Sequence, residues 1–201
     1  MIVDLLKLWG SAVPLMLSPG PAVLSVAAMG AAFGPARALR YYFGIVAGTF
    51  SVLLIVASGL TAALLSVPGL APVITVLAAG YILYLAYRIA TAPILKGGAE
   101  GDTAGAPSFL SGYLLAVANP KAFAALGALY AGHSLIPGDP YGDAAAKVGG
   151  LACMIFIANG SWLIFGTMLS KVLRDPKAGR VANIVFAVLL VLSVVISALS
   201  S

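Results

Sequence analysis

Long runs of apolar residues alternate with short polar stretches along the whole chain. The apolar runs cover residues 2–33, 39–67, 70–92, 109–132, 148–170 and 181–199. Each is close to or above the roughly 20 residues that a helix needs to span a bilayer. The runs are continuous and lack the two-residue alternation of barrel strands, so we expect helices. The pattern therefore predicts an all-α integral membrane protein with six transmembrane helices.

Composition supports this fold class. Of the 201 residues, 62% are hydrophobic and only 8% are charged, whereas soluble domains carry about a quarter charged residues. The net charge of +5 would suggest nucleic acid as a partner of a soluble protein. Here the cations flank apolar runs, so we expect a lipid bilayer and no nucleic acid. A single cysteine, Cys153, excludes an internal disulfide.

A glycine-rich polar stretch at residues 96–107 divides the chain. It separates a first three-helix repeat, residues 1–95, from a second, residues 108–201. An odd number of spans per half gives the two halves opposite orientations, as in the inverted repeats of secondary transporters. Pro19-Gly20-Pro21-Ala22 also aligns without gaps on Asn119-Pro120-Lys121-Ala122. We therefore predict two inverted repeats joined by a polar cytoplasmic linker, together forming one membrane domain.

The distribution of cations predicts the orientation. The connections after the first, third and fifth runs contain Arg37, Arg40, Arg88, Lys96, Lys171, Arg174, Lys177 and Arg180, whereas Lys7 and Lys147 lie on the other side. Cytoplasmic loops carry the excess of Lys and Arg. Both termini are therefore predicted to lie outside the cytoplasm (N-out and C-out).

Lys121 is the charged residue that lies well inside an apolar run. A lysine at the centre of a membrane helix costs roughly 2.5–3.5 kcal/mol on insertion scales, and such residues normally face a protein interior or a wet cavity. The adjacent Asn119 and Pro120 indicate an interrupted helix. All six acidic residues lie at or beyond the ends of the runs and so cannot pair with the ammonium, and a carboxylate substrate would supply the anion. The alternative is a lysine at a misplaced helix edge, or one that extends to the interface.

The first run is interrupted at Pro14 and at Ser18-Pro19-Gly20-Pro21-Ala22. A helix that restarts after Pro21 would expose free amides at its positive end, which favours a carboxylate. Broken helices at membrane depth are tolerated where they line a cavity. The prolines would alternatively do no more than kink a structural helix.

Asn159 and Trp162 in the fifth run are secondary candidates for substrate binding. An asparagine in hydrocarbon needs a hydrogen-bond partner, more often a neighbouring helix than a ligand. Trp162 would form the cavity wall or simply pack. We find no metal-ligand cluster, no nucleophile–base set and no phosphate-binding loop. The sequence therefore predicts neither an enzyme nor a cofactor.

Two of these motifs resemble a known family. Ser18-Pro19-Gly20-Pro21-Ala22, followed by small residues to Gly30 and Gly34, resembles the N-terminal signature of the lysine-exporter (LysE/RhtB-type) family. Asn119-Pro120-Lys121-Ala122 resembles its second signature. The sequence departs from the family at Ala22, because many members have Asn there. This change removes a polar side chain from the site that the resemblance implies.

The resemblance implies a transporter in the bacterial inner membrane that exports amino acids or related small metabolites, driven by the proton gradient. Its substrate site would comprise Lys121, Asn119, Pro120, Ser18, Pro19, Gly20, Pro21, Ala22, Asn159 and Trp162. Two other functions stay open: a metal-ion exporter of the same superfamily, for which the spans offer almost no ligands, and a membrane scaffold that transports nothing. Homo-oligomerisation is also left open.

Overall fold

The computed structural model describes residues 1–59, 69–91, 108–172 and 176–199, and this part of the chain is helical without strands. The helices are α1 (Ile2–Leu17), α2 (Pro21–Ala57), α4 (Leu70–Ala90), α5 (Phe109–Val117), α6 (Pro120–Ala131), α7 (Pro140–Val172) and α8 (Pro176–Leu199). The predicted linker 96–107 lies outside the described residues, as does most of the connection before α4. The predicted all-α fold class is therefore confirmed for the described part.

The first apolar run is broken at Pro19-Gly20-Pro21, as the sequence predicts. Helix α1 ends at Leu17, and α2 begins at Pro21 after the extended residue Gly20. The break predicted at Pro14 is wrong, because α1 runs through that residue. A single proline inside a helix removes one backbone hydrogen bond without having to end the helix.

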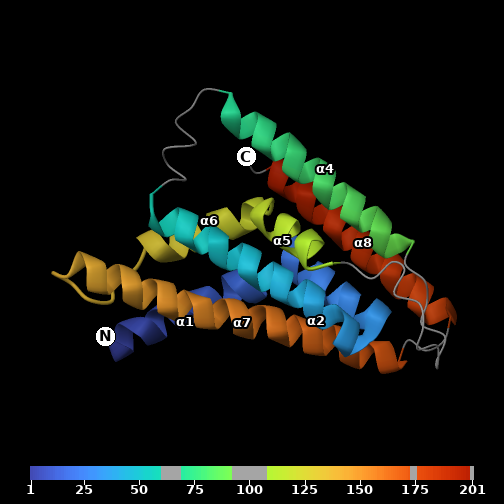
Figure 1. The fold of residues 1–201 in the computed structure, drawn as a ribbon, viewed down its shortest axis with the longest axis horizontal. Helices are drawn as coiled ribbons and strands as arrows, with labels where there is room; N and C mark the ends of the chain where they lie inside the picture. The colour runs from blue at the N-terminus through green and yellow to red at the C-terminus, as the bar shows by residue number, and fades with distance from the viewer. Residues whose placement is uncertain (60–68, 92–107, 173–175, 200–201) are drawn as a thin grey trace.

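Helix α2 consists of two segments joined at Gly34. Gly34 has φ +75°, in the left-handed region that glycine adopts without steric cost, and Pro35 follows it directly. Figure 1 shows the chain turning back at this point, so that the second segment of α2 runs beside the first. The second segment, residues 35–57, is roughly 34 Å long at 1.5 Å per residue. This is enough to cross a hydrocarbon core of about 30 Å.

The fourth apolar run is also broken. Helices α5 and α6 meet at an angle of 60°, with Ala118 and Asn119 between them. Pro120 is the first residue of α6, as Pro21 is of α2. The two half-helices therefore match when Pro21 is paired with Pro120. This pairing shifts the gapless alignment expected from the sequence by one residue and places Ala22 opposite Lys121.

Part of the polar connection between the fourth and fifth apolar runs is helical, because α7 already begins at Pro140. The Asp139 carboxylate accepts a hydrogen bond from the Gly142 backbone amide at 3.0 Å and so caps the new helix. The Asp143 carboxylate accepts one from the Ile136 backbone amide at 2.9 Å and pairs with Lys147 at 2.8 Å. These bonds hold the α6–α7 connection against the start of α7.

Helix α2 lies at the centre of the molecule, packed against α5, α6 and α7, and α4 packs beside α8 (Figure 1). Three glycines allow backbones to approach closely here. A Cβ on Gly48 would lie 2.6 Å from the Tyr113 carbonyl oxygen, and one on Gly112 would lie 2.5 Å from that of Tyr41. A Cβ on Gly44 would overlap the backbone of Phe109. This small-residue packing is typical of membrane helices, because lipid provides no hydrophobic drive between them.

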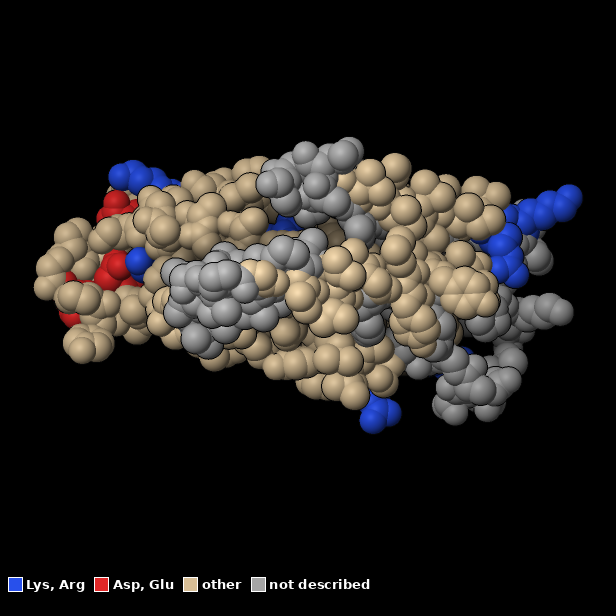
Figure 2. Space-filling model, turned by 90° about the horizontal axis from the view of Figure 1, so that it is seen from above, with Lys and Arg blue, Asp and Glu red and all other residues tan. Residues whose placement is uncertain are grey.

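Figure 2 shows the acidic side chains at one end of the molecule and basic side chains at both ends, with few charged side chains on the face between them. Among the described residues, Pro21–Ala57 and Pro140–Met168 are long and apolar enough to cross a membrane, and the bent α5–α6 pair would be a third span. The six-span arrangement remains a prediction.

Candidate functional site

The ammonium of Lys121 lies at the break between α1 and α2. It donates to the Ser18 carbonyl oxygen at 2.5 Å, to the Ser18 hydroxyl at 2.7 Å and to the Pro19 carbonyl oxygen at 3.1 Å. These carbonyls end α1, where the helix dipole is negative and the last C=O groups have no partner within the helix. The two interrupted segments, about a hundred residues apart in sequence, therefore meet through this lysine.

Gly20 is required for this contact by its size rather than by its backbone angles. Its φ of −167° is extended and open to any residue. A Cβ at this position, however, would lie 2.7 Å from Cδ and 3.0 Å from Nζ of Lys121. Any larger residue would push the lysine side chain off the α1 carbonyls.

Two further carbonyls at the end of α1 are also bonded. The Ser18 hydroxyl donates to the Leu15 carbonyl oxygen at 2.9 Å. The indole N–H of Trp162, from α7, donates to the Leu17 carbonyl oxygen at 3.2 Å. The end of α1 is thus fixed by side chains from its own break and from the second half of the chain.

The two half-helices after the breaks start differently. At α6, the Asn119 side-chain oxygen accepts from the Lys121 backbone amide at 3.2 Å, which is an N-cap. At α2, no side chain caps the helix. The first amides of α2, those of Ala22 and Val23, have no partner within the helix by geometry. They form the positive end of the α2 dipole, a favourable place for an anion.

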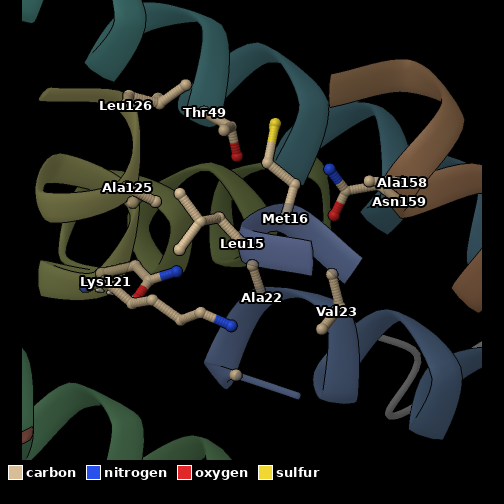
Figure 3. Close-up of a pocket in the computed structure, with 13 residues that line it drawn as sticks. Leu15, Met16, Ala22, Val23, Thr49, Lys121, Ala125, Leu126, Ala158 and Asn159 are labelled. Carbon is tan, nitrogen blue, oxygen red and sulfur yellow. Dashed lines mark hydrogen bonds between the residues drawn. The ribbon is translucent and has the colours of Figure 1, made fainter. Parts of the chain in front are cut away.

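A small cavity of about 50 Å³ lies between the breaks (Figure 3). A single water needs about 10–15 Å³ on the same scale, so the cavity holds only a few non-hydrogen atoms. Its walls come from α1, both breaks, α2, α6 and α7, and the lining residues are Leu15, Met16, Gly20, Ala22, Val23, Thr49, Asn119, Lys121, Ala122, Ala125, Leu126, Ala158 and Asn159.

The structure brings five of the predicted site residues to this cavity: Gly20, Ala22, Asn119, Lys121 and Asn159. The other five lie around it. Ser18 and Pro19 bind the Lys121 ammonium, Pro21 and Pro120 open the two half-helices, and Trp162 holds the end of α1 without lining the cavity.

Sequence reasoning missed the apolar wall and Thr49. The Thr49 hydroxyl donates to the Ile45 carbonyl oxygen at 2.8 Å and lies beside the cavity. A hydroxyl inside an apolar run was a signal that could have marked it. The alanines and leucines of the wall carry no such signal, because the same residues fill every span.

The described residues contain no group of three or more His, Cys, Asp or Glu that could hold a metal ion. What the site offers is one ammonium, one uncapped helix start and buried amide side chains around a small space. These features make the cavity the candidate binding site of the described part of the chain.

Comparison with known proteins identifies the group to which this site belongs. The sequence model of the LysE type translocator family matches residues 13–197. The chain therefore belongs to the LysE type translocator family and is a membrane transporter of small molecules, which confirms the resemblance seen in the two motifs. No curated protein and no solved structure matches the chain.

Proposed function

We propose that the protein is a secondary transporter that exports an amino acid or a related small carboxylate across the bacterial inner membrane by alternating access. The observation that carries this proposal is the ammonium of Lys121, which extends from one broken helix to the other beside a small cavity. A lysine within a membrane span normally marks a substrate or ion pathway.

The substrate carboxylate binds between Lys121 and the uncapped start of α2. In the structure the ammonium is satisfied by carbonyl oxygens, which are neutral dipoles. A carboxylate offers a full negative charge, so it adds an attraction between opposite charges that the carbonyl dipoles do not supply. The amides of Ala22 and Val23 add donors from the opposite side. On binding, the ammonium thus exchanges the oxygens at the end of α1 for the substrate carboxylate and is not left unpaired.

The two halves, residues 1–95 and 108–201, act as inverted repeats in this proposal, and residues 96–107 connect them in the cytoplasm. Their order of elements supports it. Each half has a short helix, a break and a half-helix opened by proline, followed by a longer helix and a final helix. Rocking one half against the other would open the cavity to each side in turn. Proton entry drives export, and both termini lie outside the cytoplasm.

The test is efflux from proteoliposomes loaded with labelled amino acids and short carboxylates. Lys121→Met removes the charge but keeps the length of the side chain. Removing one partner of a buried charge pair costs about 2–5 kcal/mol, so we expect efflux at subsaturating substrate to fall about 30-fold or more. Lys121→Arg keeps the charge and should retain part of the activity. Unchanged efflux in both variants would contradict the proposal.

Proton coupling needs a separate measurement. Export of the same substrates should rise when the compartment that corresponds to the periplasm is made acidic. A protonophore should abolish this rise. Export that ignores the pH gradient would contradict the proton-driven part and leave substrate binding at Lys121 intact.

A further inference from the structure

Asn159 is a cavity residue whose hydrogen bonding is incomplete. Its side chain is 3% exposed. The amide Nδ2 donates to the Ile155 carbonyl oxygen at 2.9 Å, one turn back along α7. The amide oxygen Oδ1 has no hydrogen-bond partner among the described residues. Buried side-chain acceptors normally have one, so this oxygen needs a donor that the described chain does not supply.

The orientation of the amide is determined by its neighbour. Exchanging Oδ1 and Nδ2 would place one oxygen against the Ile155 carbonyl oxygen, and neither can donate. The unpartnered atom is therefore the acceptor. Figure 3 shows the Asn159 side chain extending from α7 toward the cavity, which Lys121 also lines.

The cavity thus has two polar groups with opposite hydrogen-bonding requirements. Among the described residues that line the cavity, Lys121 is the only charged one and needs an anion, whereas the Asn159 oxygen needs a hydrogen-bond donor. The described residues that line the cavity include no acidic residue, so a second positive charge on a ligand would have no counter-ion from them. A ligand that fits both groups carries a carboxylate and an N–H donor and has no net charge.

We infer that Asn159 is a specificity-determining residue that accepts a hydrogen bond from the amino group of a small zwitterion, whose carboxylate is held at Lys121. This inference rests on the proposed function and narrows its substrates. The site favours small amino acids with uncharged side chains over simple carboxylates, which lack the donor, and over amino acids with a cationic side chain.

The experiment compares alanine with propionate, which has the same carbon skeleton without the amino group. Both are measured as competitors and as exported solutes in proteoliposomes. The wild-type protein should prefer alanine by about tenfold or more, because propionate leaves the buried acceptor unpaired. In Asn159→Leu, which is similar in size, the preference for alanine should fall toward the level of propionate. The affinity for propionate itself should change little.

Asn159→Asp provides a second test that preserves shape. The added carboxylate supplies a counter-ion, so the ratio of 2,3-diaminopropionate to alanine transport should rise about tenfold. Ser161→Ala is the matched control, because Ser161 lies on the same helix and its hydroxyl bonds the Ala158 carbonyl oxygen outside the cavity lining. It should leave both ratios unchanged.

Two results would overturn the inference. Equal loss of alanine and propionate in Asn159→Leu would assign Asn159 a structural role. Unchanged ratios in both Asn159 variants would mean that Oδ1 faces water and no ligand. In either case Lys121→Met would still lower efflux about 30-fold or more if the proposed function holds. Failure of that variant to change transport would instead reject the proposed function.

Discussion

The two helix breaks of this protein look alike in sequence but differ in how their backbone groups are satisfied. The α5–α6 break is self-contained, because the Asn119 side chain caps the Lys121 amide and the Ala118 amide bonds the Leu114 carbonyl oxygen at 2.9 Å. The α1–α2 break is completed from elsewhere. Lys121 and Trp162 bond its carbonyls, and no side chain caps the start of α2.

This difference assigns the two breaks different roles. The α5–α6 break is held by its own hydrogen bonds and positions Lys121. The α1–α2 break, called the open break below, is bonded by residues from elsewhere and can exchange these partners. Pre-organised groups held by their own hydrogen bonds lose little entropy on binding. In the proposed mechanism, substrate binding would therefore rearrange contacts at the α1–α2 break and leave the α5–α6 break in place.

The largest effect is expected from an internal competitor for the substrate. Ser18→Asp places a carboxylate where the hydroxyl now lies, 2.7 Å from the Lys121 ammonium. The resulting ion pair occupies the anion site, so efflux should fall about 30-fold or more, as after loss of the lysine charge. Ser18→Asn matches the aspartate in size and lacks its charge. It should retain most of the efflux, and equal activity in the two variants would contradict the assignment.

A smaller effect is expected from crowding the open break. Gly20→Ala adds a Cβ 2.7 Å from Cδ of Lys121, which a flexible side chain avoids by moving off the α1 carbonyls. We expect efflux to fall about tenfold, equivalent to about 1.4 kcal/mol, with little change in melting temperature. Gly10→Ala in α1, where a Cβ would meet nothing within 4 Å, is the control. If Gly20→Ala transports normally, the lysine does not need its place at the break.

Substitutions at the α5–α6 break should lower the stability of the protein more than they lower transport. Asn119→Ala removes the N-cap of α6 and should lower the free energy of unfolding by about 1 kcal/mol. Asn119→Ser keeps a capping oxygen and should recover most of this loss. Unfolding in mixed detergent micelles measures both. A variant without its cap that is as stable as the wild type would show that the break does not depend on Asn119.

The smallest effect is expected at Trp162. Trp162→Phe removes the N–H that bonds the Leu17 carbonyl oxygen and should cost about 1 kcal/mol in the free energy of unfolding. Trp9→Phe removes a similar bond, to the Gly150 carbonyl oxygen at 3.0 Å, away from the break. Both should be destabilised to a similar extent, but only Trp162→Phe should slow efflux, by a few fold. Equal efflux in the two would mean that fixing the end of α1 serves stability alone.

Much of the helical pattern follows from local physics. Apolar runs predict the helices, and Pro-Gly-Pro cannot continue one, so the first break is visible in the sequence. The error at Pro14 arises because a lone proline costs one hydrogen bond, which packing can offset. The added length of α7 depended on Asp139 acting as a cap, which its setting among turn residues concealed.

The candidate site was less predictable. Lys121 stood out because its charge is costly in an apolar run. Its partners did not, since they are backbone carbonyls and every residue carries one. The one-residue shift between the breaks depends on which proline opens each half-helix, and that is a property of the folded backbone. The free oxygen of Asn159 likewise appears only once its amide nitrogen is bonded.

The central claim is that Lys121 meets the end of α1 within one molecule, and crosslinking in membranes tests it most directly. Cysteines replace Ser18 and Lys121 in a Cys153→Ser background, and a protease site is inserted in the glycine-rich sequence 97–107. We predict that a short bifunctional maleimide joins the two halves, so that the chain still migrates at full length after cleavage, whereas neither single cysteine does so. Separation into two fragments despite full labelling of both cysteines would contradict the account.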